Sequence, residues 1–183
     1  ELMVAKDSVI QCSYGSFYSV ITILSDCEVN LASPPLATEK MHWPIQNILP
    51  LIEYGHYHFG ENKIQEARDK WSEIKKQNTS LKLHFVGKLQ TNKVKFVIPL
   101  FDYIHSLDNL KLAQKISIQQ IKVNFKPKIF IQVNIGDEIQ KNGISVNDLE
   151  IFINKCKNDL NLNIIGLMCI PPNDGNVEVH FQK

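Results

Sequence analysis

Polar clusters follow short β-prone runs at the points where helical patterns begin, at residues 59–62, 85–93 and 104–108. Two of them contain Asn62 and Ser106, whose amide and hydroxyl groups can reach a ligand that lies over strand ends. In barrels of parallel strands, ligand sites are built at the carboxyl ends of the strands. Each residue alone also suits a turn or a helix cap. The pattern therefore predicts a small-molecule site without naming its ligand.

Histidines and lysines supply the other reactive groups. His84 and His105 lie inside β-prone runs, where core histidines bonded to backbone are commoner than bases or ligands, so we interpret both as structural. A lysine that forms a Schiff base is a further possibility, since an amine with a lowered pKa attacks aldehydes. Lys40 lies ahead of Pro44 in a proline-flanked segment, a setting more typical of a surface residue.

Composition excludes several classes of function. The chain has 183 residues, 20 basic against 19 acidic side chains, and a net charge of +1, which gives no general attraction to nucleic acid or to an anionic membrane. Lys88, Lys93 and Lys95 form a basic run, but no aromatic residues interleave to stack bases. The four cysteines show neither zinc-site spacing nor disulfide density, which favours a reducing cytosol. The most apolar N-terminal segment, 17–24, is too short to span a bilayer.

The elements that must position these residues alternate between strand and helix. Strands are predicted at residues 57–59, 82–86, 102–105, 128–134 and 163–170. Helical patterns follow Asn62, Asp108 as a plausible N-cap, and Ser145, which has Asp148 three residues later in a capping-box-like arrangement. A shorter helix-like run covers 45–54. This alternation is typical of linked βαβ units in an α/β fold, and either a barrel or a doubly wound sheet satisfies it.

Five motifs in order carry a resemblance to a known family. They are Phe59-Gly60-Glu61-Asn62-Lys63, His84-Phe85-Val86-Gly87, His105-Ser106-Leu107-Asp108, Gln132-Val133-Asn134 and Gly166-Leu167-Met168. From 44 to 172 the chain resembles the pyridoxal 5′-phosphate (PLP) homeostasis proteins, the YggS-like or PROSC family, whose fold is that of the alanine racemase N-terminal barrel.

The resemblance implies one TIM-type barrel domain over 1–183, with 1–43 divergent. It implies a non-catalytic, cytoplasmic carrier or buffer of PLP that holds the cofactor through a lysine Schiff base and has PLP-dependent apoenzymes as possible partners. Lys40 matches the Schiff-base lysine if one residue is inserted before Pro44, whereas an ungapped match puts Met41 there. Asn62, Ser106 and Met168 match strand-end positions near the cofactor.

Two departures from the family pattern set the alternatives. Pro34-Pro35 and Glu39 replace what should be an apolar first strand, and the last strands with their phosphate loop are absent, so we expect about six of eight strands. A truncated, non-binding remnant of the family is therefore one alternative. A PLP-dependent racemase is another, weakened because racemases carry a second, β-rich domain.

Overall fold

Parallel strands joined by helices make up the part of the chain that the computed structural model describes, which is residues 10–11, 45–136 and 142–170. The strands are β1 (Ile10–Gln11), β2 (His58–Glu61), β3 (Lys82–Phe85), β4 (Tyr103–Leu107), β5 (Lys128–Asn134), β6 (Ile144–Ser145) and β7 (Asn163–Cys169). The helices are α1 (Ile45–Glu53), α2 (Ile64–Gln77), α3 (Val94–Val97), α4 (Leu110–Val123) and α5 (Leu149–Asn154). Short 3₁₀ turns precede α3 at Thr91–Lys93 and α5 at Val146–Asp148, and a π-helical turn, Lys155–Asp159, follows α5.

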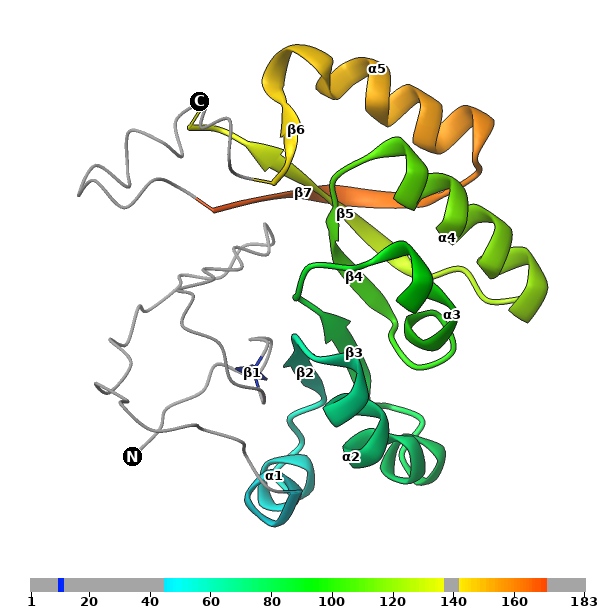
Figure 1. Cartoon of the computed structure of the whole chain (residues 1–183). Helices are drawn as coiled ribbons and strands as arrows, with labels where there is room; N and C mark the ends of the chain where they lie inside the picture. The colour runs from blue at the N-terminus through cyan, green and yellow to red at the C-terminus, as the bar shows by residue number, and fades with distance from the viewer. Residues whose placement is uncertain (1–9, 12–44, 137–141, 171–183) are drawn as a thin grey trace.

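All pairings in the sheet are parallel. The strand order is β1-β2-β3-β4-β5-β6, with β7 beside β5. Strand and helix alternate along the chain as predicted, and the described part of the sheet does not close on itself (Figure 1). The prediction of an α/β fold with an incomplete barrel is confirmed.

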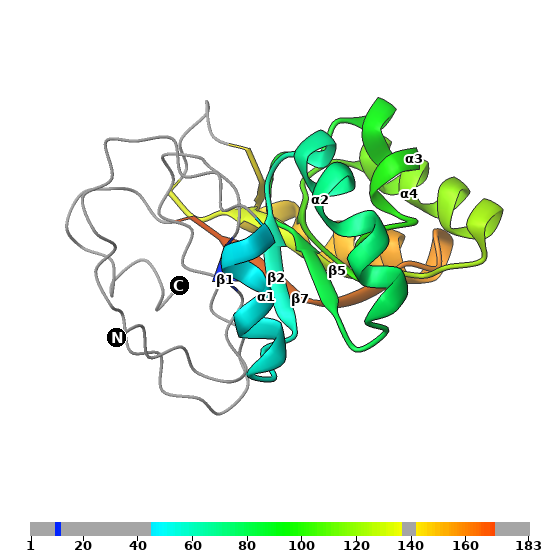
Figure 2. The ribbon, with the colours of Figure 1, turned by 90° about the horizontal axis from the view of Figure 1, so that it is seen from below.

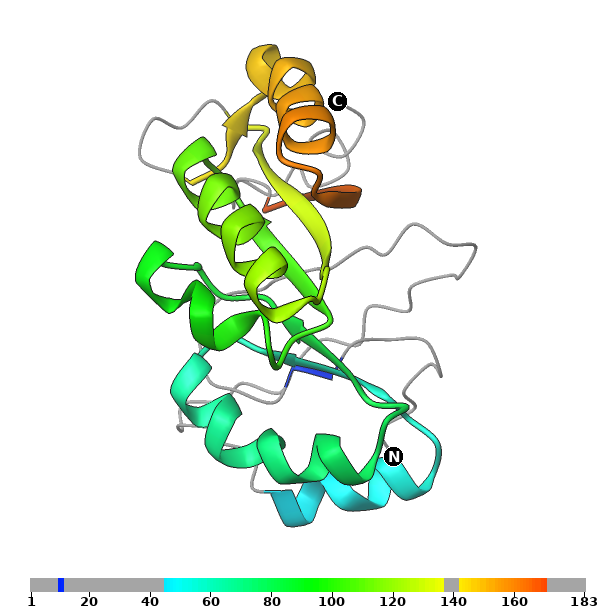
Figure 3. The same cartoon turned by 90° about the vertical axis from the view of Figure 1, so that its right-hand side faces the viewer.

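The helices lie on one side of this sheet. Seen from the right-hand side of Figure 1, helices α2 to α5 stand in front of the strands (Figure 3), and from below α2, α3 and α4 run along the same face (Figure 2). We call this the helix face and the opposite side the inner face. In a barrel of this class the inner face would line the interior.

Alternation along the strands divides the side chains between the two faces. The helix face receives the apolar set, and the helices add their own buried stripe. The strand residues are Phe59, Leu83, Phe85, Ile104, Leu107, Ile129, Ile131 and Val133; the helix residues include Ala67, Trp71, Val94, Val97, Leu112, Ala113, Ile116 and Phe152. Ring contacts such as Phe59 on Trp71, with centroids 4.9 Å apart, join the layers. This face holds the hydrophobic core.

Helix starts follow local chemistry. The N-cap of α4 is Asn109, whose Oδ1 accepts a hydrogen bond from Leu112 N at 2.9 Å, so the prediction of Asp108 as the cap is wrong by one residue. Asp108 instead accepts a bond from the Asn109 amide at 2.6 Å. The predicted capping arrangement at Ser145 is confirmed, because Asp148 N donates to Ser145 Oγ at 3.1 Å.

Strand ends differ from prediction in two places. β2 runs through Glu61 and β4 through Leu107, whereas the sequence assigned both positions to polar clusters beyond the strands. Glu61 and Ser106 are buried strand residues, so a polar side chain did not mark a strand end. The strand beside β2 is β1, and Lys40 with its flanking residues lies outside the described residues. Across the described helices, none has the length and apolar character needed to span a membrane.

Candidate functional site

Three histidines from successive strands form a chain on the inner face. Nδ1 of His58 on β2 lies 2.9 Å from Nε2 of His84 on β3. Nδ1 of His84 lies 2.9 Å from Nε2 of His105 on β4. Both distances are those of N–H···N hydrogen bonds, so each imidazole is bonded to the next. The structural interpretation of His84 and His105 expected backbone partners, and the structure gives them ring partners instead.

Aromatic rings and one lysine surround this chain. Tyr103 stacks on His84, with centroids 4.1 Å apart and planes 6° apart. Phe130 stacks on His105 at 4.5 Å. The Lys128 ammonium lies 5.1 Å from the centroid of the Tyr103 ring and donates to its hydroxyl at 3.2 Å. These contacts place the five side chains from β3, β4 and β5 on the inner face.

Burial keeps the inner histidines neutral. Desolvation lowers the pKa of His84 to about 2, helped by the neighbouring His105 and His58 and, more weakly, by Lys128 and Lys75. Desolvation also lowers the pKa of His105 to about 4. A low dielectric disfavours the imidazolium form, and no carboxylate is among the causes that would restore it. At neutral pH both rings therefore carry one proton each.

A β-bulge presents Ser106 next to His105. On β4, Ile104 and Leu107 pair with Ile129 and Ile131 of β5, so three steps of β4 face two steps of β5. The extra residue turns consecutive side chains to the same side, as bulges near active sites do. Ser106 is 3% exposed, and its Oγ has no hydrogen-bond partner among the described residues. The Nδ1 atom of His105 is also buried and has no hydrogen-bond partner among the described residues.

Asn62 lies directly beyond β2, where two strand ends approach each other closely. A Cβ atom placed on Gly87, which follows β3, would stand 2.2 Å from the Asn62 carbonyl oxygen. Only glycine fits this approach. The N-cap of α2 is Lys63, with no side-chain cap, so Asn62 does not serve as the N-cap of α2.

Met168 lies on β7, opposite Gln132 of β5. Phe130 also pairs with Gly166, and its ring lies 2.9 Å from where a Gly166 Cβ would stand. Gly166 and Met168 are two residues apart and therefore share the inner face. Met168 is half-buried there.

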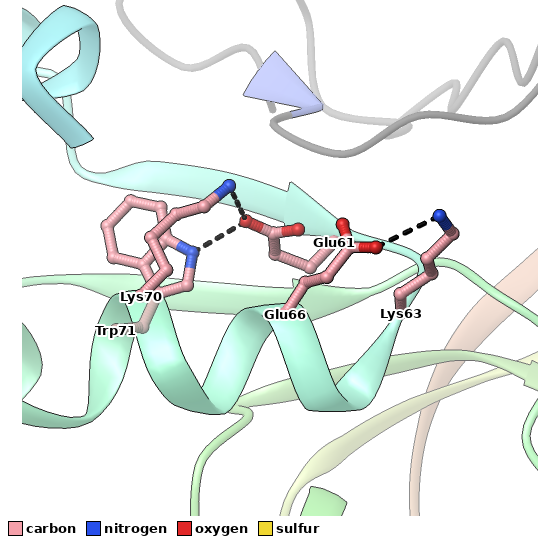
Figure 4. A network of polar contacts seen from close by, with 5 residues as sticks. All are labelled: Glu61, Lys63, Glu66, Lys70 and Trp71. Carbon is pink, nitrogen blue, oxygen red and sulfur yellow. Dashed lines mark hydrogen bonds and ion pairs between the residues drawn. The ribbon is translucent and has the colours of Figure 1, made fainter. Parts of the chain in front are cut away.

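A second buried polar cluster lies on the helix face of β2 (Figure 4). Oε1 of Glu61 accepts hydrogen bonds from Lys70 Nζ at 2.8 Å and from Trp71 Nε1 at 2.7 Å. Glu61 is fully buried and Lys70 is 5% exposed at the side chain. The neighbouring pair of Lys63 and Glu66, 2.9 Å apart, is open to solvent. This cluster fixes α2 against β2 and takes no part in the inner face.

The predicted site residues thus have different outcomes. Asn62, Ser106 and Met168 lie at the carboxyl ends of β2, β4 and β7, along one edge of the sheet, as the sequence predicted. Lys40 lies outside the described residues. In the basic run, Lys88 donates to Asn142 at 2.6 Å, while Lys93 and Lys95 lie 6.0 and 4.8 Å from the centroid of the Phe96 ring.

Two surface hollows of the described residues lie away from the carboxyl edge. Hollows of about 370 and 480 Å³ lie on the helix side, the first lined by residues of α4 and the turn before α3, the second by residues of α2 and α3 with the loop after α3. Neither is lined by Asn62, Ser106 or Met168. Within 45–136 and 142–170, no three histidine, cysteine or acidic side chains gather as metal ligands.

His58 is the member of the histidine chain that the sequence analysis did not identify. A histidine occurs in each of three successive β-prone runs, at spacings of 26 and 21 residues. This recurrence is a visible signal. It predicts contact only when the register is known, because the three rings meet along a diagonal of the sheet.

Comparison with known proteins identifies relatives of this protein. The family model for the alanine racemase N-terminal domain matches residues 37–182. The chain is 36% identical over 128 residues to the pyridoxal phosphate homeostasis protein of Pasteurella multocida, covering 70% of this chain and 55% of that protein. It is 33% identical over 140 residues to the protein of the same name from Escherichia coli K12, covering 76% and 60%. The chain therefore spans little more than half the length of these relatives.

Solved structures agree with the fold. PipY of Synechococcus elongatus, solved with PLP bound, superposes with a TM-score of 0.65 at 31% identity, covering 74% of this chain and 62% of PipY. An alanine racemase of Clostridium difficile superposes with a TM-score of 0.54 at 13% identity, covering 68% and 31%, a likeness that shows the fold alone. The expected resemblance to PLP homeostasis proteins is confirmed.

Proposed function

The chain belongs to the alanine racemase N-terminal domain family, and from this premise we propose that it binds PLP at the carboxyl edge of its sheet as a carrier or buffer of the cofactor. The relatives named pyridoxal phosphate homeostasis proteins and the PLP complex of PipY support the choice of cofactor. The observation that carries the proposal is Ser106, a buried hydroxyl at the carboxyl end of β4 that has no hydrogen-bond partner in the described part of the chain. A buried hydroxyl left unpaired is costly, and a polar ligand would satisfy it.

The described residues fit the aromatic ring and polar substituents of a small ligand such as PLP. Ser106 offers a hydroxyl and Asn62 an amide for hydrogen bonds, while Met168 gives an apolar, polarisable surface for a ring. The close approach of Gly87 to Asn62 fixes the loop that carries the amide. When bound, PLP supplies an electrophilic aldehyde and an electron-withdrawing ring.

Lys40 is the amine that we propose to capture this aldehyde. A lysine amine attacks a carbonyl when it is deprotonated and held close. The family match begins at residue 37 and so includes Lys40. Asn62, Ser106 and Met168 would then orient the ring and shield it from water.

The proposal assigns no steady turnover to this chain. The relatives from Pasteurella multocida and Escherichia coli are named for homeostasis, and the likeness to racemases is one of fold alone. We place the protein in the cytoplasm and PLP-dependent apoenzymes among the recipients of the cofactor, because a carrier requires acceptors.

A visible absorbance titration with PLP tests the proposal. The unmodified chain should develop a band from cofactor bound to lysine, Lys40→Ala should lose it, and Lys63→Ala, which removes an exposed lysine, should retain it. Ser106→Ala should weaken binding without abolishing the band, by the value of one hydrogen bond, about 1 kcal/mol.

Three outcomes would overturn parts of this proposal. A band that survives in Lys40→Ala rules out Lys40. The lack of any band in the unmodified chain favours the non-binding alternative. Steady formation of D-alanine from L-alanine by the purified protein, at ordinary enzyme rates, favours the racemase alternative.

A further inference from the structure

The histidine chain crosses the inner face and ends at a buried nitrogen that has no hydrogen-bond partner among the described residues, and we propose that His58, His84 and His105 form a proton relay between solvent and the ligand site. The relay rests on contacts among described residues. Its use toward a ligand at the carboxyl edge rests on the proposed function.

The path of the chain is set by the strand register. His58 is level with Lys82 at the amino end of β3, and His84 is level with Gly60 and Tyr103. His105 lies two residues beyond Tyr103 on β4. The chain therefore climbs diagonally from the amino ends of the strands toward their carboxyl ends, where ligands bind in this class of fold.

The two ends of the chain differ in exposure. His58 is partly exposed to solvent, whereas His84 and His105 are each 1% exposed. The inner end, His105 Nδ1, has no partner among the described residues, and the next residue, Ser106, has an unpartnered Oγ. Two orphaned polar atoms on consecutive residues indicate one place where a polar ligand group completes the hydrogen bonding.

Hydrogen-bond bookkeeping allows only two arrangements of protons. A neutral imidazole has one N–H donor and one acceptor nitrogen. If His105 donates from Nε2 to His84 Nδ1, then His84 must donate from Nε2 to His58 Nδ1. In the reverse arrangement His58 donates from Nδ1, His84 donates from Nδ1, and His105 presents an N–H at its inner Nδ1.

Conversion between these arrangements moves one proton across the sheet. His105 Nδ1 accepts a proton from the ligand, and His105 passes its Nε2 proton to His84 Nδ1. His84 passes its Nε2 proton to His58 Nδ1, and His58 releases its Nε2 proton to solvent. Every ring is neutral before and after, one proton enters and one leaves, and no group is oxidised or reduced.

The surroundings favour neutral rings, as this relay requires. The groups around His84 on the inner face are His58 from β2, Tyr103 and His105 from β4, and Lys128 from β5. The charge of Lys75 on α2 acts on His84 from the helix face. The lysines disfavour an added positive charge, and burial disfavours it more strongly. An imidazolium at the centre would present two donors and interrupt the acceptor sequence.

The direct test measures tautomers by ¹⁵N NMR of the histidine rings in the complete chain at neutral pH, without ligand. We expect His58, His84 and His105 to share one tautomer, all Nε2–H or all Nδ1–H. His56 is not part of the histidine chain, and its Nε2 lies 2.8 Å from the His58 carbonyl oxygen. It therefore serves as an internal reference for the Nε2–H tautomer. Different tautomers among the three rings, or a doubly protonated His84, would overturn the relay.

Variants at His84 separate proton transfer from packing. His84→Gln keeps one donor and one acceptor but does not pass a proton on, whereas His84→Phe removes both. Circular dichroism verifies that each variant is folded. In His84→Gln the tautomers of His58 and His105 should become independent of each other, and if they stay coupled the relay is wrong.

The rate of PLP capture provides the second readout. Both variants should slow the appearance of the visible band about tenfold or more and should lower its solvent deuterium isotope effect. If His84→Gln shows the same rate and isotope effect as the unmodified chain, His84 is only structural and the relay is overturned. If the unmodified chain shows no band, the proposed function fails, and the tautomer measurement still decides the relay by the outcomes given above.

Discussion

Two buried polar clusters lie on opposite faces of the same sheet, and they offset the desolvation of their polar groups in different ways. On the helix face, Glu61 bonds to Lys70 and Trp71, so a carboxylate is compensated by an ammonium and an indole N–H. On the inner face, the histidine chain is held by hydrogen bonds between imidazole rings, and burial keeps those of His84 and His105 neutral. Each cluster has a buried atom without a hydrogen-bond partner among the described residues, Glu61 Oε2 and His105 Nδ1.

The difference separates fixed structure from adaptable chemistry. A buried ion pair tolerates the loss of neither charge, so the Glu61 cluster holds α2 in one position. A chain of neutral rings can reverse its protons without creating a charge, so the inner face can adjust to a ligand. Stability is therefore concentrated on the helix face and proton chemistry on the inner face.

The largest expected effect comes from breaking the ion pair on the helix face. Glu61→Ala leaves the buried Lys70 ammonium without this carboxylate and should lower the free energy of unfolding by about 3–5 kcal/mol. Urea unfolding followed by circular dichroism measures it.

Two controls sharpen this result. Glu66→Ala removes a carboxylate that is one-third exposed from the same helix and should cost about 0–1 kcal/mol. Glu61→Leu combined with Lys70→Met should cost less than Glu61→Ala, because no unpaired charge remains. Equal costs for Glu61→Ala and Glu66→Ala would show that the helix-face cluster is not a fixed structural node.

The second largest effect on stability is expected at Gly87, at the carboxyl edge of the sheet. Gly87→Ala places a Cβ against the Asn62 carbonyl and should cost about 3 kcal/mol, at the upper end of overpacking effects. PLP binding should weaken in the same variant, because the loop that carries the Asn62 amide must move. Thermal unfolding and the absorbance titration measure the two effects, and an unchanged melting temperature would contradict the close approach.

Acid should lower the free energy of unfolding through the two buried histidines of the inner face. The pKa of His84 and His105 is lowered in the folded state, so below the ordinary histidine pKa of about 6.5 the unfolded chain binds more protons. The contribution of the neutral rings is complete above that pH and is lost as the pH falls, by about 2 kcal/mol per histidine between pH 6.5 and 5. Urea unfolding across this range measures it.

His84→Phe is the matched variant for this prediction. Without the His84 ring its share of the proton uptake on unfolding disappears, so the loss of stability between pH 6.5 and 5 should shrink by about one histidine's share. An unchanged pH dependence would assign the acid sensitivity to other groups.

The smallest expected effect is at the rim of the inner face. Lys128→Ala removes a cation from the Tyr103 ring and should cost about 0.5–1 kcal/mol, because the lysine is exposed. The same change should raise the pKa of His84, which the Lys128 charge helps to lower. NMR titration of the ring measures this, and a further fall in the pKa would contradict the assigned cause.

Sequence reasoning predicted the elements better than their polar ends. β5 was predicted with its observed bounds, since 128–134 is nearly continuous in apolar residues, as a strand covered on both faces should be. Glu61 and Ser106 were assigned to clusters beyond their strands because a polar residue ordinarily marks a strand end. Partners nine and ten residues away in α2 allow Glu61 to lie inside.

Local pattern also predicted part of the candidate site. The positions of Asn62 and Ser106 follow from the strand-to-helix junctions, because parallel strands bring their carboxyl ends to one edge, and Met168 was predicted from the family motifs alone. The unpartnered state of Ser106 Oγ could not be predicted, since it depends on the bulge in β4.

The order of the residues alone determined the alternation of strand and helix, the apolar helix face and the family to which the chain belongs, because these depend on periodicity and motif spacing within short segments. The tertiary structure alone decided that His58, His84 and His105 touch, since residues 21 and 26 positions apart meet only through the register of three parallel strands. Burial in that register also keeps His84 and His105 neutral. A histidine's sequence neighbours set its strand, whereas its hydrogen-bond partner and its pKa are properties of the assembled sheet.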